Sequence, residues 1–238
     1  MKGIILAGGS GSRLRPLTKV TSKQLLPIYN KPMIYFPLET LIKAGIRDIL
    51  IIVAPDHAGD FLKLLGSGSE FGCKFTYEIQ DKPAGLPQAF IIGENFMGDD
   101  NVTLILGDNI FEDNFTADIA GFKSGGRIFA KEVPDPERFG VAAFDEHNKV
   151  ISIIEKPKVP ASNYAVTGLY IYDNSVVQKA KSLQPSDRGE LEIVDLHNLF
   201  LQEGTLDVAF VKGKWLDTGT FESLYEAINF VREKERAQ

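Results

Sequence analysis

Residues 3–13 read GIILAGGSGSR, a short apolar run that passes directly into a loop with three glycines and an arginine. A buried strand followed by such a loop suits phosphate binding, because glycines let backbone N–H groups approach anionic oxygens closely. The loop lacks the Gly-Lys-Ser/Thr ending of a Walker loop, and Leu14 stands where a Rossmann dinucleotide site has its third glycine. The spacing therefore favours a phosphate loop of another kind, with a plain turn rich in small residues as the alternative.

Apolar runs and helical patterns alternate along the first half of the chain. They predict strands and helices in turn, at 3–6, 32–44, 49–53, 58–65, 75–79, 88–96 and 102–106. This βαβ rhythm indicates an α/β fold, with a Rossmann-like, mainly parallel twisted sheet and helices on both faces. In such a fold the ligand site lies beyond the carboxyl ends of the strands.

Strand patterns predominate after residue 125. We expect strands at 127–133, 141–144, 150–155 and 164–172, followed by helices at 190–203 and 220–236. The second half is therefore predicted to be mixed α/β. Because no long linker or internal repeat separates the halves, we expect a single domain over residues 1–238.

Composition narrows the function classes. One cysteine, Cys73, excludes an intramolecular disulfide framework and a multi-cysteine zinc cluster, which favours a cytoplasmic protein. No stretch approaches the roughly 20 apolar residues of a membrane span. A net charge of −6 argues against general nucleic-acid or anionic-membrane binding, yet residues 1–38 hold six basic and no acidic side chains. Anion binding is therefore expected to be local.

Several motifs in order carry a resemblance to a known family. GGSGSRLRPLT at 8–18 followed by SKQLLPI at 22–28 closely resembles the signature of sugar-1-phosphate nucleotidyltransferases. Further segments are similar to the glucose-1-phosphate thymidylyltransferase branch: LGDN at 106–109, EKPK at 155–158, YAVTGLY at 164–170, RGELEI at 188–193 and WLDTGT at 215–220. The resemblance covers nearly the whole chain and implies a nucleotide-binding half at 1–125 and a sugar-phosphate-binding half at 126–238.

The implied reaction transfers a thymidylyl group from dTTP to glucose 1-phosphate, giving dTDP-glucose and pyrophosphate for deoxysugar, dTDP-rhamnose type, and cell-surface polysaccharide synthesis. Such a transfer needs cations and a metal rather than a strong base, because the attacking phosphate is already ionised. By resemblance, Arg13 and Lys23 are the catalytic cations, and Asp108 and Asp217 hold Mg²⁺. For Asp108 alone, a turn-capping role is the alternative.

The resemblance also assigns two sets of binding residues. The nucleotide set is Leu6, Gly8, Gly9, Ser10, Gly11, Ser12, Arg13, Gln24, Gln80, Pro83, Gly85, Leu86 and Asp108. The sugar-phosphate set is Asn109, Phe139, Gly140, Glu155, Lys156, Thr167, Gly168, Tyr170 and Trp215. In these sets Gln80 reads the base, Glu155 accepts from sugar hydroxyls and Lys156 holds the phosphate.

Two rival functions stay open at this stage. One is a UTP-dependent uridylyltransferase or a relative that uses another sugar phosphate, because a single methyl group separates thymine from uracil. The other is a non-catalytic sugar-nucleotide-binding regulator, which the joint presence of Lys23, Asp108 and Asp217 disfavours. The three histidines and Cys73 show no ligand spacing and receive no role.

The resemblance further implies a homo-oligomer. Many members of the family continue into a further helical region, whereas this chain ends at Gln238 and resembles a short form. Feedback inhibition through a second nucleotide site is therefore left open.

Overall fold

Four apolar runs of the first half form neighbouring parallel strands in one part of the sheet. They are β1 (Lys2–Ala7), β4 (Asp48–Val53), β5 (Lys74–Ile79) and β6 (Val102–Leu106), in the spatial order β6-β1-β4-β5. Residues 49–53 have no solvent exposure, because helices cover both faces of these strands. A parallel sheet buried on both sides explains why the strands read as continuous apolar runs.

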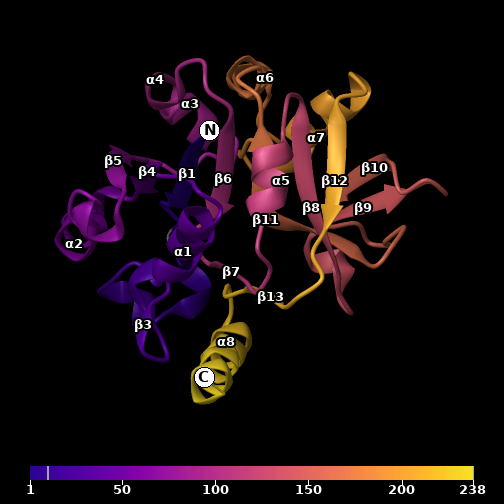
Figure 1. Ribbon diagram of the computed structural model, residues 1–238. Coiled ribbons are helices and arrows are strands. Elements are labelled where there is room, and N and C mark those ends of the chain that lie inside the picture. Colours follow the sequence, from indigo (N-terminus) through magenta and orange to yellow (C-terminus); the bar gives the residue numbers. More distant parts are fainter. Residues whose placement is uncertain (10, 238) are drawn as a thin grey trace.

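The computed structural model describes residues 1–9 and 11–237, and in this part of the chain the central sheet has nine strands (Figure 1). The second half adds β8 (Gly126–Glu132), β9 (Gly140–Phe144), β10 (Val150–Glu155), β11 (Tyr164–Tyr172) and β12 (Leu206–Phe210). Strand β11 pairs antiparallel with β6, β8 and β9, so it joins the two halves of the sheet. The predicted change from a parallel to a mixed region is confirmed.

Helices form a layer on each face of the sheet. They are α1 (Tyr35–Lys43), α2 (Ala58–Leu65), α3 (Gln88–Ile92), α4 (Glu94–Met97), α5 (Thr116–Gly121), α6 (Val176–Ser182) and α7 (Ile193–Gln202), whereas α8 (Phe221–Arg236) lies outside these two layers. Strand alternation divides the core: Ile4 packs with α3, α6 and α7 on one face, and Ile5 packs with α1, α2 and α5 on the other.

A third apolar cluster lies beside the carboxyl ends of the parallel strands. There α8 packs on the hairpin of β2 (Pro27–Ile28) and β3 (Lys31–Pro32), below the sheet in Figure 1. Thr220 begins α8 with a capping box, in which the Thr220 and Ser223 side chains each accept from the other's backbone N–H. This cluster fixes the glycine-loop segment against the short strand pair of β7 (Asn109–Phe111) and β13 (Trp215–Asp217).

The structure corrects several predicted boundaries. The first helix begins at Tyr35 rather than residue 32, because Lys31–Pro32 pairs in the β2–β3 hairpin. The helix predicted at 88–96 breaks at Gly93, where a Cβ atom would lie 3.0 Å from Ile4 and 3.1 Å from Leu50. The helix predicted at 190–203 begins only at residue 193, and α5, α6, β7, β12 and β13 were not predicted.

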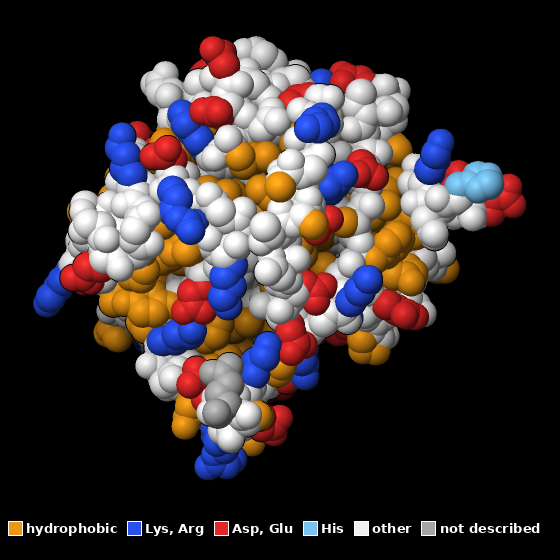
Figure 2. All heavy atoms as spheres, in the orientation of Figure 1, with side chains coloured by type: hydrophobic (Ala, Val, Ile, Leu, Met, Phe, Trp, Pro, Cys, Tyr) orange, Lys and Arg blue, Asp and Glu red, His pale blue; other side chains and the backbone are white. Residues whose placement is uncertain are grey.

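Surface charge and helix length concern two kinds of partner, nucleic acids and membranes. On the face that Figure 2 shows, Lys and Arg side chains alternate with Asp and Glu and do not gather in one basic patch. Within residues 1–9 and 11–237, no helix is both long and apolar enough to cross a membrane.

Candidate active site

Two adjoining cavities lie at the carboxyl ends of the parallel strands, where the sequence predicted the ligand site. The larger has a volume of about 440 Å³ and the smaller about 210 Å³. Gly9, Asp108 and Glu190 are among the residues that border both cavities. A ligand in one cavity therefore lies next to a ligand in the other.

Most of the predicted site residues line these cavities. The smaller cavity is bordered by Leu6, Gly9, Lys23, Gln24, Gln80, Pro83, Gly85, Leu86 and Asp108. The larger is bordered by Arg13, Asn109, Phe139, Gly140, Glu155, Lys156, Gly168, Tyr170, Trp215 and Asp217. The structure thus brings together side chains from both halves of the chain, although their roles stay predictions.

A few predicted residues lie elsewhere. Ser10 falls outside the described residues. Gly8, Gly11 and Ser12 belong to the same loop but are not among the lining residues of either cavity. Gly8 lies directly beneath Gln80, since a Cβ atom on Gly8 would come within 2.3 Å of the Gln80 Oε1 atom.

Thr167 was predicted to line the sugar pocket, but the structure places its side chain elsewhere. Along β11, Val166, Gly168 and Tyr170 face the larger cavity, so the intervening Thr167 points to the opposite face of the sheet. Its side chain is wholly buried, and its hydroxyl has no hydrogen-bond partner in the described part of the chain. Thr167 does not line the cavity, because a strand alternates its side chains.

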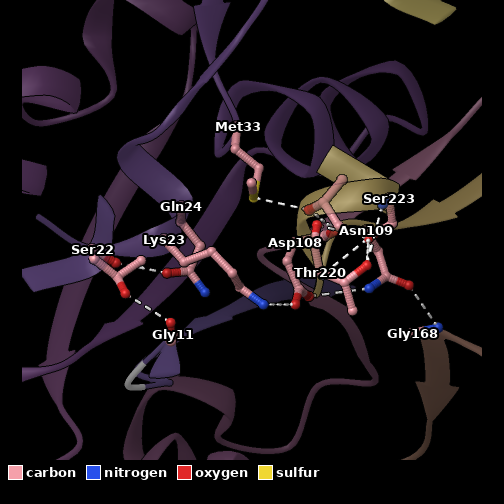
Figure 3. Close-up of polar contacts among 12 residues, drawn as sticks. Gly11, Ser22, Lys23, Gln24, Met33, Asp108, Asn109, Gly168, Thr220 and Ser223 are labelled. Atoms are coloured by element: carbon pink, nitrogen blue, oxygen red, sulfur yellow. Dashed lines mark hydrogen bonds and ion pairs between the residues drawn. The ribbon is translucent and has the colours of Figure 1, made fainter. Parts of the chain in front are cut away.

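Lys23 and Asp108 form an ion pair where the two cavities meet (Figure 3). Lys23 begins a short 3₁₀ helix, Lys23–Leu25, and is only 8% exposed, whereas Asp108 follows the end of β6. Burial alone would raise the pKa of Asp108, but the Lys23 ammonium and a hydrogen bond from Asn109 outweigh burial and lower it. Asp108 is therefore an anion that already holds a cation.

Asp217 lies beside this ion pair through strand pairing. β13 runs antiparallel to β7 and places Asp217 opposite Asn109, the residue after Asp108. Burial, and then the negative charge of Asp108, raise the pKa of Asp217 from 3.8 to about 6, against the opposing effect of Lys23, Arg13 and Arg138. Two carboxylates that repel each other thus face one cavity.

Arg13 reaches the same corner from the glycine loop. Its guanidinium packs over Gly219, where a Cβ atom would come within 2.6 Å of the Arg13 Nη2 atom. Arg13 is exposed, and no hydrogen bond or ion pair of its side chain occurs among the described residues. A guanidinium that borders a cavity and has free donors is well placed for forked contacts with phosphate.

Asn109 holds together several residues of the larger cavity. Its Oδ1 atom accepts from the Gly168 backbone N–H at 3.0 Å and from the Trp215 Nε1–H at 2.7 Å. Its Nδ2 atom donates to Asp108 at 3.1 Å (Figure 3). Asn109 borders the cavity as predicted, but these contacts occupy its amide, so it also fixes the residues around it.

A connected pair of amides lies beside the smaller cavity. The Gln80 Nε2 atom donates to Gln88 Oε1 at 2.7 Å, and the same oxygen accepts from the Ala84 backbone N–H at 2.9 Å. The loop then pairs with the second half: Gly85 forms a bridge with Leu191, and a Cβ atom on Gly85 would lie 2.0 Å from the Leu191 carbonyl oxygen. The sequence missed the contribution of Gln88.

Residues 2–234 match the nucleotidyl transferase family. The chain belongs to this family. Two glucose-1-phosphate thymidylyltransferases, from Neisseria meningitidis and Mycolicibacterium smegmatis, are 56% and 53% identical over the whole of this chain, which covers 85% and 84% of their own lengths.

Solved structures agree with this nucleotidyl transferase assignment. A Bacillus anthracis protein provisionally named a glucose-1-phosphate thymidylyltransferase, in complex with sucrose, superposes with a TM-score of 0.93 at 50% identity, over 98% of this chain and 95% of that one. A UDP-glucose pyrophosphorylase complexed with UDP-glucose has a TM-score of 0.85 at 24% identity, with 98% of each chain covered, and shares the fold. The predicted nucleotidyltransferase fold and family are confirmed.

The larger cavity is also bordered by residues for which the sequence predicted no role. Arg188 lies at its mouth, where its Nη2 atom donates to Glu192 at 2.6 Å and lies 3.5 Å from Glu155. Glu155 also pairs with Lys156 at 3.1 Å. The segment RGELEI at 188–193 was quoted only as a matching motif, and its charge pattern is the signal that would have pointed to this mouth. Val194 and His197 on α7 complete the wall.

Proposed function

We propose that this nucleotidyl transferase moves a thymidylyl group from dTTP to glucose 1-phosphate and forms dTDP-glucose and pyrophosphate, in support of deoxysugar and polysaccharide synthesis. The observation that carries the proposal is the meeting of two cavities at Asp108, with Lys23, Arg13 and Asp217 around it. The names of relatives more than half identical to the chain support dTTP and glucose 1-phosphate as the substrates.

In this proposal, residues 1–125 supply most of the nucleotide site and residues 126–238 most of the sugar-phosphate site. An oxygen of the sugar phosphate attacks the α-phosphorus in line, and the bond to the bridging α–β oxygen breaks, so pyrophosphate leaves with the electron pair. Arg13 and Lys23 neutralise the phosphates and hold them in position. Lys156 and Arg188, two cations at the mouth of the larger cavity, hold the sugar phosphate.

The residues present suit a divalent cation. Asp108 and Asp217 are hard oxygen donors, and the pKa of Asp217 is raised by burial and then by the charge of Asp108, so a bound cation would offset the cost of its negative charge. No group of three or more His, Cys, Asp or Glu side chains in residues 1–9 and 11–237 could hold a metal by itself. We therefore assign Mg²⁺ to these two carboxylates together with substrate phosphate oxygens; when bound, it screens the charge that develops on the phosphates.

The proposal also assigns roles to one residue of each cavity. Gln80 reads the thymine edge from the smaller cavity, and Glu155 accepts hydrogen bonds from sugar hydroxyls in the larger. A homo-oligomeric assembly and a cytoplasmic location stay predictions from the sequence.

The experiment measures pyrophosphate release with dTTP or UTP against glucose, galactose and N-acetylglucosamine 1-phosphates. We expect the highest kcat/KM for dTTP with glucose 1-phosphate. UTP should be used roughly 10- to 200-fold less well, because one methyl group contributes only about 1–3 kcal/mol of discrimination. A preference for UTP would favour the uridylyltransferase, and the absence of turnover with every pair would favour a binding protein.

A further inference from the structure

A buried histidine forms part of the wall of the larger cavity. His197 lies on α7, has no solvent exposure, and borders the cavity beside Tyr170, with their ring centroids 5.0 Å apart. Its Nδ1 atom is 2.7 Å from the hydroxyl oxygen of Tyr172. In the described part of the chain its Nε2 atom has no hydrogen-bond partner.

The contact with Tyr172 fixes where the imidazole proton lies. Burial raises the pKa of Tyr172 and lowers the pKa of His197 to about 3, so the phenol keeps its proton and the ring is neutral near pH 7. If Tyr172 donates to Nδ1, the ring proton must be on Nε2. If Nδ1–H instead donated to Tyr172, both the tyrosine O–H and the Nε2 atom of His197 would lack a partner. His197 therefore presents an Nε2–H donor that the described residues leave unsatisfied.

An unsatisfied donor in a buried wall calls for an explanation, because native proteins pair almost all buried polar groups. The neighbours of His197 point to the sugar side. Val194 lies one turn earlier on α7, and its Cγ2 atom would be 3.0 Å from a Cβ atom on Gly140. Glu155, the proposed acceptor for sugar hydroxyls, is on the same side of the cavity and would lie 3.4 Å from that Cβ atom.

We propose that His197 is a specificity-determining residue, whose Nε2–H donates to one hydroxyl oxygen of the bound sugar, directly or through one water. This inference rests on the proposed function and deepens it. A neutral N–H favours a sugar with an uncharged oxygen at that position over a deoxygenated one. Nε2 is covered by its neighbours, so the contact requires a shift of an adjacent side chain.

The test compares His197→Phe, which keeps a buried ring but lacks the donor, with the wild type on glucose 1-phosphate and its 2-, 3-, 4- and 6-deoxy analogues. We expect the wild type to lose about tenfold in kcat/KM on one analogue, the value of a neutral hydrogen bond. The variant should show that loss already with glucose 1-phosphate and no further loss with that analogue. The KM for dTTP should not change. His197→Asn, which retains an N–H donor, should recover part of the discrimination.

Two controls separate the possible failures. His147→Phe changes an exposed histidine in the β9–β10 turn and should match the wild type on every substrate. If both His197 variants discriminate among the four analogues as the wild type does, the inference is wrong. An equal fall on all five substrates would also overturn it, since that result indicates a purely structural role. A wild type that does not turn over glucose 1-phosphate refutes the proposed function instead.

Discussion

Burial of the Asp217 carboxylate, together with its repulsion by Asp108, predicts that the site lowers the stability of the fold. Asp217→Asn removes one of the two charges and nearly preserves the size of the side chain. Because the folded protein raises the pKa of Asp217, its ionisation above about pH 6 costs stability, and this cost disappears as the pH falls toward 3.8. The variant should therefore be more stable than the wild type at pH 8, by a margin that shrinks at pH 5.

The difference between 3.8 and about 6 corresponds to about 3 kcal/mol at pH 8. Asp217 borders an open cavity in which water screens its charge, so we expect about 1–2 kcal/mol, or a Tm about 3–6 °C higher. Thermal unfolding at pH 5 and pH 8 measures this difference. Added Mg²⁺ should raise the Tm of the wild type more than that of the variant, because the cation relieves the repulsion only where both carboxylates remain.

Activity completes this test. Asp217→Asn should abolish Mg²⁺-supported pyrophosphate release, while Asp99→Asn, an exposed change at the opposite edge of the sheet, should alter neither activity nor Tm. A variant that is less stable than the wild type at pH 8, or whose stability difference does not depend on pH, would refute the electrostatic reasoning. Full Mg²⁺-supported activity in the variant would remove Asp217 from the metal site.

Three further predictions use the same assays. Arg13→Ala should lower turnover by about 100-fold or more and leave the Tm nearly unchanged, because an exposed side chain contributes little to stability; wild-type turnover would exclude its role. Gly85→Ala should raise the KM for dTTP and lower the Tm, since φ is +102° and a Cβ atom would meet Leu191. Gly59→Ala, in α2 with open space around its Cβ position, should leave the KM unchanged and should not lower the Tm, because alanine favours the helix. Removal of divalent cations with a chelator should abolish turnover and Mg²⁺ should restore it; turnover that persists in chelator argues against a metal.

The strands and several helices of this chain are encoded locally. The apolar runs at 102–106, 150–155 and 164–172 and the amphipathic segment at 58–65 have the predicted bounds, because burial of a strand or of one helix face requires a short-range pattern of apolar residues. The glycine loop and Asp108 also followed from sequence, since both stand next to strand ends. The sequence pattern therefore predicted that ligands bind at the carboxyl ends of the parallel strands.

Tertiary contacts decided what the pattern could not express. Gly93 separates α3 from α4, and a Cβ atom there would lie 3.0 Å from Ile4 and 3.1 Å from Leu50, two residues that are distant in sequence. The family motif contains both Thr167 and Gly168, but only the orientation of β11 in the sheet decides that Gly168 borders the cavity and Thr167 does not. The local sequence does not specify which residue from a distant part of the chain will pack at a given position.

The sequence alone determined the family, the order of the main elements and the residue types that gather around phosphate, since each depends on motifs or on short-range periodicity. Only the folded structure decided which side chains meet. β7 pairs with β13 and thereby places Asp217 beside Asp108, across more than 100 residues of chain. α7 packs on β11 and leaves His197 with one nitrogen bonded and one free in the described protein. The physical reason is that burial and charge repulsion depend on distances in space, which distances along the chain do not specify.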